Sequence, residues 1–221
     1  MKICCTSDSH GYLPDIPDCD IFLHAGDITP FTNHKLNFQK HWLINDFNPW
    51  LRSIQSKYKI IIPGNHDFIF QENPNIKHHL DCILLYNELV EVEGIKIWGS
   101  PWTKRFFDWA FNMSAKKLYK LHTSIPKCDI ILTHGPPYGF GDLCWRPSQF
   151  KNNSNIPKYQ THEGSPGLIR KILEIEPKYV FYGHIHEGFG NRKLENTNIC
   201  NVSYVDSGYT STNGTPQIFY L

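Results

Sequence analysis

Side chains of the kinds that bind metal ions follow a series of short apolar runs in this chain of 221 residues. Carboxylates, imidazoles and one amide stand just after these runs, beside glycine, serine or proline residues that favour turns. Their oxygen and nitrogen atoms suit borderline or hard divalent ions such as Mn, Fe, Zn or Co. The candidate ligands are Asp8, His10, Asp27, Asn65, His134, His184 and His186.

The number of candidate ligands points to two ions rather than one. Seven ligands are too many for one four-coordinate ion, but they suit two ions that share a carboxylate. Two ions about 3.5–4 Å apart are a recurrent device for the hydrolysis of phosphoesters. The sequence therefore predicts a dinuclear metal site and phosphoester chemistry.

Each motif taken alone also has an ordinary structural interpretation. Asp8-Ser9-His10 and Gly26-Asp27 are typical of turns with a capping carboxylate. Gly64-Asn65-His66-Asp67 and Gly183-His184-Ile185-His186 are more specific, because in each of them two such side chains stand close together after an apolar run. With Thr133-His134-Gly135-Pro136-Pro137 there are five such motifs, in order and each at a strand end, and their recurrence favours the metal site.

The elements that must position these residues are short strands alternating with helices. Nearly continuous apolar runs indicate strands covered on both faces, and the alternation favours a layered α/β fold. In such a fold the loops at the carboxyl ends of the strands gather into one crevice, which brings the ligands together. Strands are expected at residues 2–6, 20–24, 58–62, 129–133, 179–182, 199–205 and 217–221, a hairpin at 89–98, and helices at 35–53, 114–122 and 166–175.

Composition excludes several other classes of protein. The 22 basic residues balance 21 acidic ones, so the net charge of +1 gives no reason to expect a nucleic-acid partner. No apolar run approaches the roughly 18 residues of a membrane span, and the N-terminus becomes polar too soon for a signal peptide. The seven cysteines form no C-x-x-C pair, so we expect thiols in an intracellular, cytoplasmic protein. Residues 1–221 contain no linker and are expected to form a single domain, whose oligomeric state stays open.

The other histidines receive mostly structural interpretations. His24 lies within an apolar run and is expected in the core, whereas His162 is a candidate for a substrate contact. It lies in residues 139–165, which are rich in proline, asparagine, glycine and serine and predict a long loop acting as a lid. A surface position is expected for His34, His41, His78, His79 and His122. Aromatic candidates for stacking a nucleobase are Tyr138, Phe140, Trp145 and Phe189.

The ordered motifs D-x-H, G-D, G-N-H-D, T-H-G-P-P and G-H-x-H resemble those of the calcineurin-like metallophosphoesterase superfamily. The chain is most similar to the metallophosphoesterase-domain-containing (MPPED) subgroup. Residues 23–29, 99–102, 133–139 and 186–190 carry that likeness. The resemblance implies a four-layer α/β sandwich, in which two mixed β-sheets pack face to face with helices on both outer sides, and a dinuclear site at the sheet edge.

The resemblance also implies a role for each candidate ligand. It assigns Asp27 to both ions as the bridging ligand. It implies that His66, which follows the ligand Asn65, is the catalytic proton donor and that both residues contact the substrate. The first ion is then held by Asp8, His10, Asp27 and His186, and the second by Asp27, Asn65, His134 and His184.

One departure bears on the choice of substrate. The phosphoprotein phosphatase branch has a G-D-x-x-D-R-G motif, whose second Asp orients the catalytic His and whose Arg grips phosphate. Here Asp27 is followed by Ile28-Thr29-Pro30-Phe31, with neither residue. This difference weakens the protein phosphatase interpretation. Some members of the MPPED subgroup replace a histidine of the last motif with glycine, but this chain keeps both His184 and His186.

These observations predict a metal-dependent phosphodiesterase that acts on small nucleotides such as cyclic nucleotides through a metal-bridging hydroxide. Two divalent ions (Mn, Fe, Zn or Co) are expected as cofactors, with Mn favoured for assays. The alternatives are a phosphomonoesterase or protein phosphatase, or a nucleotide-binding scaffold with vestigial turnover. A nuclease is disfavoured because the near-neutral charge offers no track for a nucleic-acid backbone.

Overall fold

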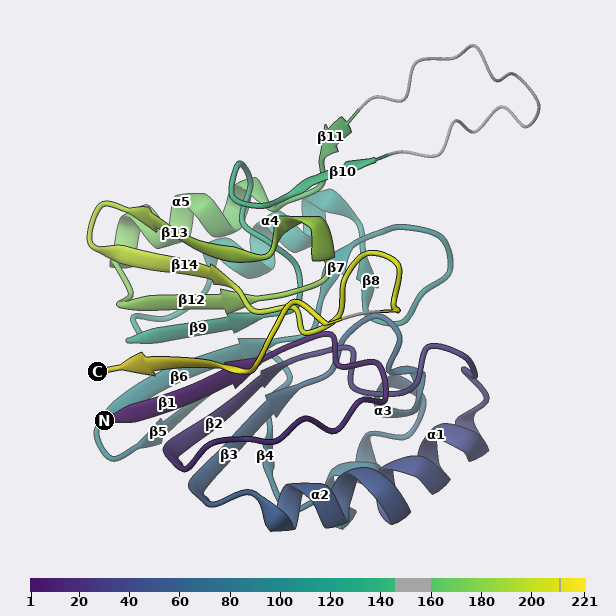
Figure 1. Ribbon diagram of the computed structural model, residues 1–221. Coiled ribbons are helices and arrows are strands. Elements are labelled where there is room, and N and C mark those ends of the chain that lie inside the picture. Colours follow the sequence, from purple (N-terminus) through teal and green to yellow (C-terminus); the bar gives the residue numbers. More distant parts are fainter. Residues whose placement is uncertain (146–159, 211) are drawn as a thin grey trace, which may run out of the picture.

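The computed structural model describes residues 1–145, 160–210 and 212–221 (Figure 1). Its first sheet has five strands, of which the first four strands of the chain pair in parallel. The C-terminal strand joins this sheet as an antiparallel edge. The order across the sheet is β15 (Gln217–Tyr220), β1 (Lys2–Thr6), β2 (Cys19–Ala25), β3 (Ser56–Ile62) and β4 (Ile83–Leu84).

The second sheet has six strands and is also mixed. Its inner strands pair in parallel, and each edge strand belongs to an antiparallel hairpin. The order is β13 (Gly190–Leu194), β14 (Thr197–Asn201), β12 (Tyr179–Tyr182), β9 (Ile130–Thr133), β6 (Ile95–Ser100) and β5 (Glu88–Val92). The predicted hairpin is confirmed as β5–β6, and its two-residue turn at Glu93 and Gly94 has the positive φ angles typical of a type I′ turn.

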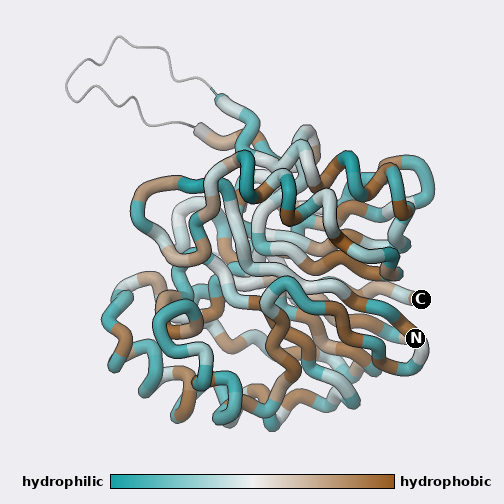
Figure 2. The backbone as a smooth tube through the Cα atoms, turned by 180° about the vertical axis from the view of Figure 1, so that it is seen from behind, coloured by the Kyte–Doolittle hydropathy of each residue, from teal (hydrophilic) through white to brown (hydrophobic). Residues whose placement is uncertain are grey.

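Helices cover the outer face of each sheet, as Figure 1 shows. On the first sheet lie α1 (Leu36–Trp42), a π-helical turn (Leu43–Phe47), α2 (Asn48–Ser53), α3 (Phe68–Glu72) and a 3₁₀ turn (Pro74–His79). On the second lie α4 (Ala115–Thr123) and α5 (Pro166–Ile175). The tube of Figure 2 alternates teal and brown along the outer helices, as expected for helices that bury only one face. The predicted four-layer sandwich is confirmed.

The buried strands explain why their sequences read as continuous apolar runs. In β1, Ile3 and Cys5 point into the core between the sheets, whereas Cys4 points toward the helices on the outer face. In β2, Leu23 points inward and Phe22 outward in the same way. Because both faces are covered, neither side of these strands needs polar residues.

The long predicted helices are largely confirmed, and α4 and α5 lie within one residue of their expected bounds. The segment expected as one helix at 35–53 is instead interrupted by the π-helical turn at Leu43–Phe47. Pro49 follows this turn and cannot donate a backbone hydrogen bond, which accounts for a widened turn at this point. Shorter elements were not predicted: α3, the 3₁₀ turn, β4, β13, β7 (Thr103–Lys104), β8 (Asn112–Met113), β10 (Leu143–Trp145) and β11 (Gln160–His162).

The segment predicted to be a lid is structured at its two ends. β10 pairs with β11 in antiparallel fashion, with Leu143 opposite His162. Residues 146–159, at the centre of the predicted lid, lie outside the described residues. Among the helices that the structure describes, none combines the length and apolar character that a membrane span requires.

Candidate metal centre

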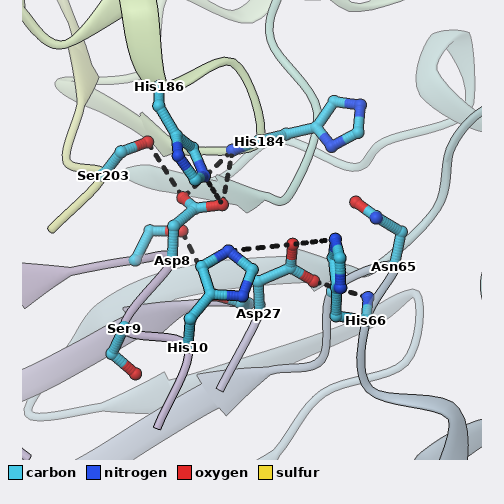
Figure 3. Close-up of polar contacts among 12 residues, drawn as sticks. Asp8, Ser9, His10, Asp27, Asn65, His66, His184, His186 and Ser203 are labelled. Carbon is cyan, nitrogen blue, oxygen red and sulfur yellow. Dashed lines mark hydrogen bonds and ion pairs between the residues drawn. The ribbon is translucent and has the colours of Figure 1, made fainter. Parts of the chain in front are cut away.

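The carboxyl ends of β1, β2, β3, β9 and β12 meet at one edge of the sandwich, and the candidate ligands come from the loops that follow them. Three groups of possible ligand atoms lie there, each with its atoms within 4.8 Å of one another. The groups are Asp8, His10 and His186; His10, Asp27 and His66; and Asp8, Asp27 and His134. Figure 3 labels all of these residues except His134. The convergence that the sequence predicts is therefore present for five of the seven ligands, with His66 beside them.

The ligand loops hold an uncommon backbone conformation. Asp8, His10, Asp27 and His184 all have positive φ, between 45° and 68°. This left-handed region is sparsely populated by residues other than glycine, and such residues concentrate at functional sites. Backbone hydrogen bonds hold two of the loops together, from Asp8 N to Gly26 O at 2.8 Å and from His10 N to Asp27 O at 3.0 Å. These sharp bends turn the side chains toward a common centre.

Asp8 is fully buried and accepts hydrogen bonds from several directions. The backbone N–H of His184 reaches it at 3.0 Å, the hydroxyl of Ser203 at 2.9 Å, and Nε2 of His186 lies 3.2 Å from its Oδ1. Burial alone would raise the pKa of Asp8, but the hydrogen bond and charge of His186 outweigh burial and hold it below its usual range. Asp8 is therefore an ionised carboxylate, the form that a metal ligand requires.

Asp27 belongs to two of the three ligand groups and so lies near the middle of the centre. Its Oδ2 is 3.3 Å from Nε2 of His134 and 3.7 Å from Nε2 of His10. Its Oδ1 accepts the backbone N–H of His66 at 2.7 Å. Although burial opposes ionisation, the charges of His134 and His66 lower the pKa of Asp27 well below its ordinary value. A central, ionised carboxylate suits the predicted bridging role.

Backbone carbonyls orient two of the ligand histidines. Nδ1 of His134 donates to Ala25 O at 2.8 Å, and Nδ1 of His186 donates to Asp206 O at 2.9 Å. In both rings this bond leaves Nε2 facing the carboxylates, which is the usual second support of a metal-ligating histidine. Burial would lower the pKa of His134, but Asp27 raises it to about 9. The carboxylates thus attract positive charge into this buried centre.

His10 provides the strongest sign that the centre binds cations. Its side chain is only 3% exposed, and among the described residues neither ring nitrogen has a hydrogen-bond partner. Burial lowers the pKa of His10 to about 3, so the ring is neutral and keeps a free lone pair. Buried polar atoms normally have partners. A divalent ion beside Asp8 and Asp27 would satisfy this nitrogen, and the mixed oxygen and nitrogen donors fit such an ion.

The remaining predicted ligands are placed less closely. Asn65 Oδ1 lies 2.9 Å from Nε2 of His134, so Asn65 contacts the centre through that ring. His184 is half-buried, and in Figure 3 its imidazole points away from Asp8 although its backbone N–H donates to that carboxylate. Its ring lies 5.0 Å from that of His134. The structure therefore brings His184 to the edge of the centre but not into its ligand groups.

His66 borders the centre and contacts a histidine that the sequence placed at the surface. Nε2 of His66 is 3.9 Å from Oδ2 of Asp27, and its Nδ1 is 3.0 Å from Nε2 of His34. The surface position expected for His34 is only partly right: the residue is half-buried, because the loop that follows Asp27 brings it back over the site before α1 begins. Burial is the main cause that lowers the pKa of His66, against the opposing charge of Asp27.

His122 was wrongly expected at the surface. It is 1% exposed, and its Nδ1 lies 2.7 Å from the hydroxyl of Ser165. It follows buried Leu118 by four residues, so the helical period places both on the face of α4 that packs against the rest of the protein. His24 is fully buried beside Ser9, as predicted. The surface positions expected for His41, His78 and His79 are confirmed.

A cavity of about 250 Å³ opens beside the centre. Asp27, Asn65, His66, His184 and His186 line one side of it, and Lys104, which pairs with Glu163 at 3.0 Å, lines another. None of Tyr138, Phe140 and Phe189 is among its lining residues, and the side chain of Trp145 lies outside the described residues. The aromatic lining is instead Trp102, Phe106, Trp109 and Tyr209. His162 pairs with Asp142 at 2.8 Å and does not line the cavity.

Asp67 holds two loops of the centre together, a role that was not predicted from the sequence. This buried carboxylate accepts the backbone N–H groups of Ile28, Thr29 and Gly64 at 2.8–3.1 Å. It thereby ties the loop after β2 to the loop after β3. Burial raises the pKa of Asp67 to about 6. The sequence feature that could have indicated this role is the position of Asp67 at the end of the Gly64-Asn65-His66-Asp67 motif.

Comparison with known proteins agrees with this geometry. The sequence pattern of the calcineurin-like phosphoesterase family matches residues 1–188. Metallophosphoesterase domain-containing protein 1 of Homo sapiens is 31% identical over 92% of the chain and 67% of its own length. UPF0046 protein T07D4.2 of Caenorhabditis elegans is 30% identical over 86% of the chain and 52% of its own length. The crystal structure of TT1561 of Thermus thermophilus shares the fold, with a TM-score of 0.53, 16% identity, and coverage of 90% and 88% of the two chains. The chain belongs to the calcineurin-like phosphoesterase family.

Proposed function

We propose that this chain is a dinuclear metal-dependent phosphodiesterase of small nucleotides such as cyclic nucleotides, with manganese able to support activity. The observation that carries the proposal is the meeting of Asp8, Asp27, His10, His134 and His186 at one sheet edge, beside a cavity of about 250 Å³. Ionised carboxylates and imidazole nitrogens in this arrangement suit two divalent ions.

Different residues of the centre have different roles in hydrolysis. The seven candidate ligands would hold two divalent ions, which would supply neutralisation of charge on phosphoryl oxygens and activation of a water molecule. Asn65 and His66 stand at the wall of the cavity, where a phosphoryl group must enter. His66 acts as the general acid in its imidazolium form, which its lowered pKa makes the minor form at neutral pH, because its Nε2 side faces the centre and it is not needed as a ligand.

The cavity supports a small diester as substrate. It is lined by Trp102, Phe106, Trp109 and Tyr209, whose rings can stack against a planar base, and by the cation of Lys104. A volume of about 250 Å³ lies just below the usual range of ligand sites, which favours a small ester over a folded protein. The absence of the Asp and Arg of the G-D-x-x-D-R-G motif after Asp27 points the same way.

A substrate screen tests this proposal. Protein reconstituted with Mn²⁺ is assayed on 2′,3′- and 3′,5′-cyclic nucleotides, mononucleotides, bis(p-nitrophenyl) phosphate and a phosphopeptide, with Asp27→Asn as the inactive control. Turnover of cyclic nucleotides well above that of the monoesters and the phosphopeptide is expected. Preference for mononucleotides would identify a phosphomonoesterase. Nucleotide binding without turnover of any ester would identify a scaffold, and either result overturns the proposal.

A further inference from the structure

We propose that His34 is a positioning residue that holds the imidazole of His66 with Nε2 toward the reacting ester. This inference rests on the proposed function, in which His66 protonates the leaving group. The contact that carries it is the one between Nε2 of His34 and Nδ1 of His66, at 3.0 Å. This contact gives a hydrogen-bond partner to Nδ1 of His66, the ring nitrogen on the side away from the metal centre.

The backbone of His66 is already fixed, so the ring orientation is the freedom that remains. Its N–H donates to Oδ1 of Asp27 at 2.7 Å, and its carbonyl accepts the side-chain amide of Gln39 at 2.7 Å. With the backbone held, rotation about the side-chain bonds decides which nitrogen meets the substrate. The hydrogen bond with His34 selects the rotamer in which Nδ1 points outward and Nε2 lies 3.9 Å from Oδ2 of Asp27.

The direction of this hydrogen bond follows from the work of a general acid. An imidazolium that gives up its Nε2 proton must keep the proton on Nδ1. Nδ1–H of His66 then donates to Nε2 of His34, which accepts as a neutral imidazole. Since the acceptor carries no charge, it orients the acid without holding its proton as strongly as a carboxylate would. His34 therefore fixes both the tautomer and the direction of the proton that His66 delivers.

Aromatic rings enclose this histidine pair. Trp109 lies against His66 with ring centroids 4.3 Å apart, and it meets the edge of His34 at 5.2 Å. Phe68 packs against the ring of His34, with ring centroids 5.3 Å apart. His66 is only 8% exposed. Water therefore competes poorly for Nδ1, and the hydrogen bond with His34 keeps more of its strength than an exposed one.

The first experiment measures steady-state kinetics of His34→Ala, with His34→Gln as the conservative variant and the exposed His41→Ala as the matched control. The substrates are a 2′,3′-cyclic nucleotide, whose alkoxide needs a proton, and bis(p-nitrophenyl) phosphate, whose phenolate hardly does. We expect His34→Ala to lower kcat on the cyclic nucleotide by about 10–100-fold, as loss of an orienting partner does. KM, metal content and aryl-ester turnover stay within about twofold. His34→Gln, whose amide oxygen can accept from Nδ1, restores most of the rate, and His41→Ala changes nothing.

A merely structural role for His34 would give a different pattern. It would slow both esters equally or release metal, and either result overturns the proposal. A double-mutant cycle sharpens the distinction, because His34→Ala should cost almost nothing further in protein that already carries His66→Gln. An added loss of the same 10–100-fold in that background would contradict the positioning role.

A second readout separates this inference from the proposed function. In ¹⁵N-histidine NMR of the metal-free and Zn²⁺-loaded protein, we expect His66 to hold its proton on Nδ1, and His34→Ala to give a mixture of both tautomers. An unchanged His66 signal in His34→Ala overturns the assignment even if the esterase is active. Absence of turnover by the unmodified protein on every ester would instead contradict the proposed function, whatever the tautomer of His66.

Discussion

The two sides of the candidate metal centre are built differently. On the first side, Asp8, His10 and His186 lie within 4.8 Å of one another and are all buried. On the second side, His184 is half-buried with its ring pointing away from Asp8, and Asn65 contacts His134 instead of a carboxylate. Of these residues the cavity is lined by Asn65, His184 and His186, but not by Asp8 or His10.

This contrast indicates that one side of the centre is suited to holding a metal ion and the other to admitting a substrate. The first side is closed by the ring of Tyr209, which lies 4.7 Å from His10 and 5.0 Å from His186. Its ligands need little rearrangement, so binding of a first ion costs little conformational entropy. The second side opens to the cavity, which both Asn65 and His184 line. We therefore expect the two ions to bind with unequal affinities.

The largest effect is expected from Asp27→Asn, because Asp27 is the carboxylate common to both sides. The substitution removes negative charge that His10, His134 and His66 all face. We expect loss of at least one metal equivalent and of nearly all turnover. Elemental analysis of the purified variant checks this, and two retained equivalents would disprove the bridging assignment.

The next effect concerns the acid on the cavity side. His66→Gln should slow hydrolysis of a cyclic nucleotide by about 10²–10⁴-fold, the usual contribution of general acid catalysis. The nitrophenyl ester, with its good leaving group, should slow far less, and metal content should not change. Similar losses on both esters would mean that His66 only binds a phosphoryl oxygen. Loss of metal would mean that it holds the Asn65 loop in shape.

A smaller effect distinguishes the two sides directly. Calorimetric titration of metal-free protein with Zn²⁺ should give two dissociation constants that differ by about tenfold or more, or about 1.4 kcal/mol. His184→Ala should weaken only the weaker step, and His10→Ala the tighter one. If both variants weaken the same step, the contrast between the two sides is wrong.

The smallest effect is expected on the fold itself. Removal of metal by EDTA should abolish turnover but leave circular dichroism unchanged, because the ligands sit on loops while three apolar clusters hold the sheets and helices. The protein before chelation is the control. Collapse of secondary structure on chelation would show that the centre is structural.

The sequence predicted those features that depend on local pattern. Continuous apolar runs such as that around Leu23 identified the buried strands, and the residue types after each run identified the loops that converge. It could not predict His34, whose burial depends on a loop that turns back over Trp109 and His66. His122 was predictable in principle, since it follows Leu118 by one helical turn on the buried face of α4.

The cavity lining was predicted least well. Trp102, Phe106 and Trp109 lie around the short pairing of β7 with β8, whose strands have two residues each and leave no periodic signal. The aromatic residues chosen from the sequence were instead those nearest the motifs, such as Tyr138. The motifs therefore predicted which loops converge, but not which residues line the cavity beside them.

Activity measured against bound metal shows whether two ions are needed for turnover. Metal-free protein is titrated with Mn²⁺, and at each step bound metal is counted while hydrolysis of a 2′,3′-cyclic nucleotide is recorded. We expect almost no turnover up to one bound equivalent and a steep rise as the second binds. Full activity at one equivalent, or none at two, would contradict it.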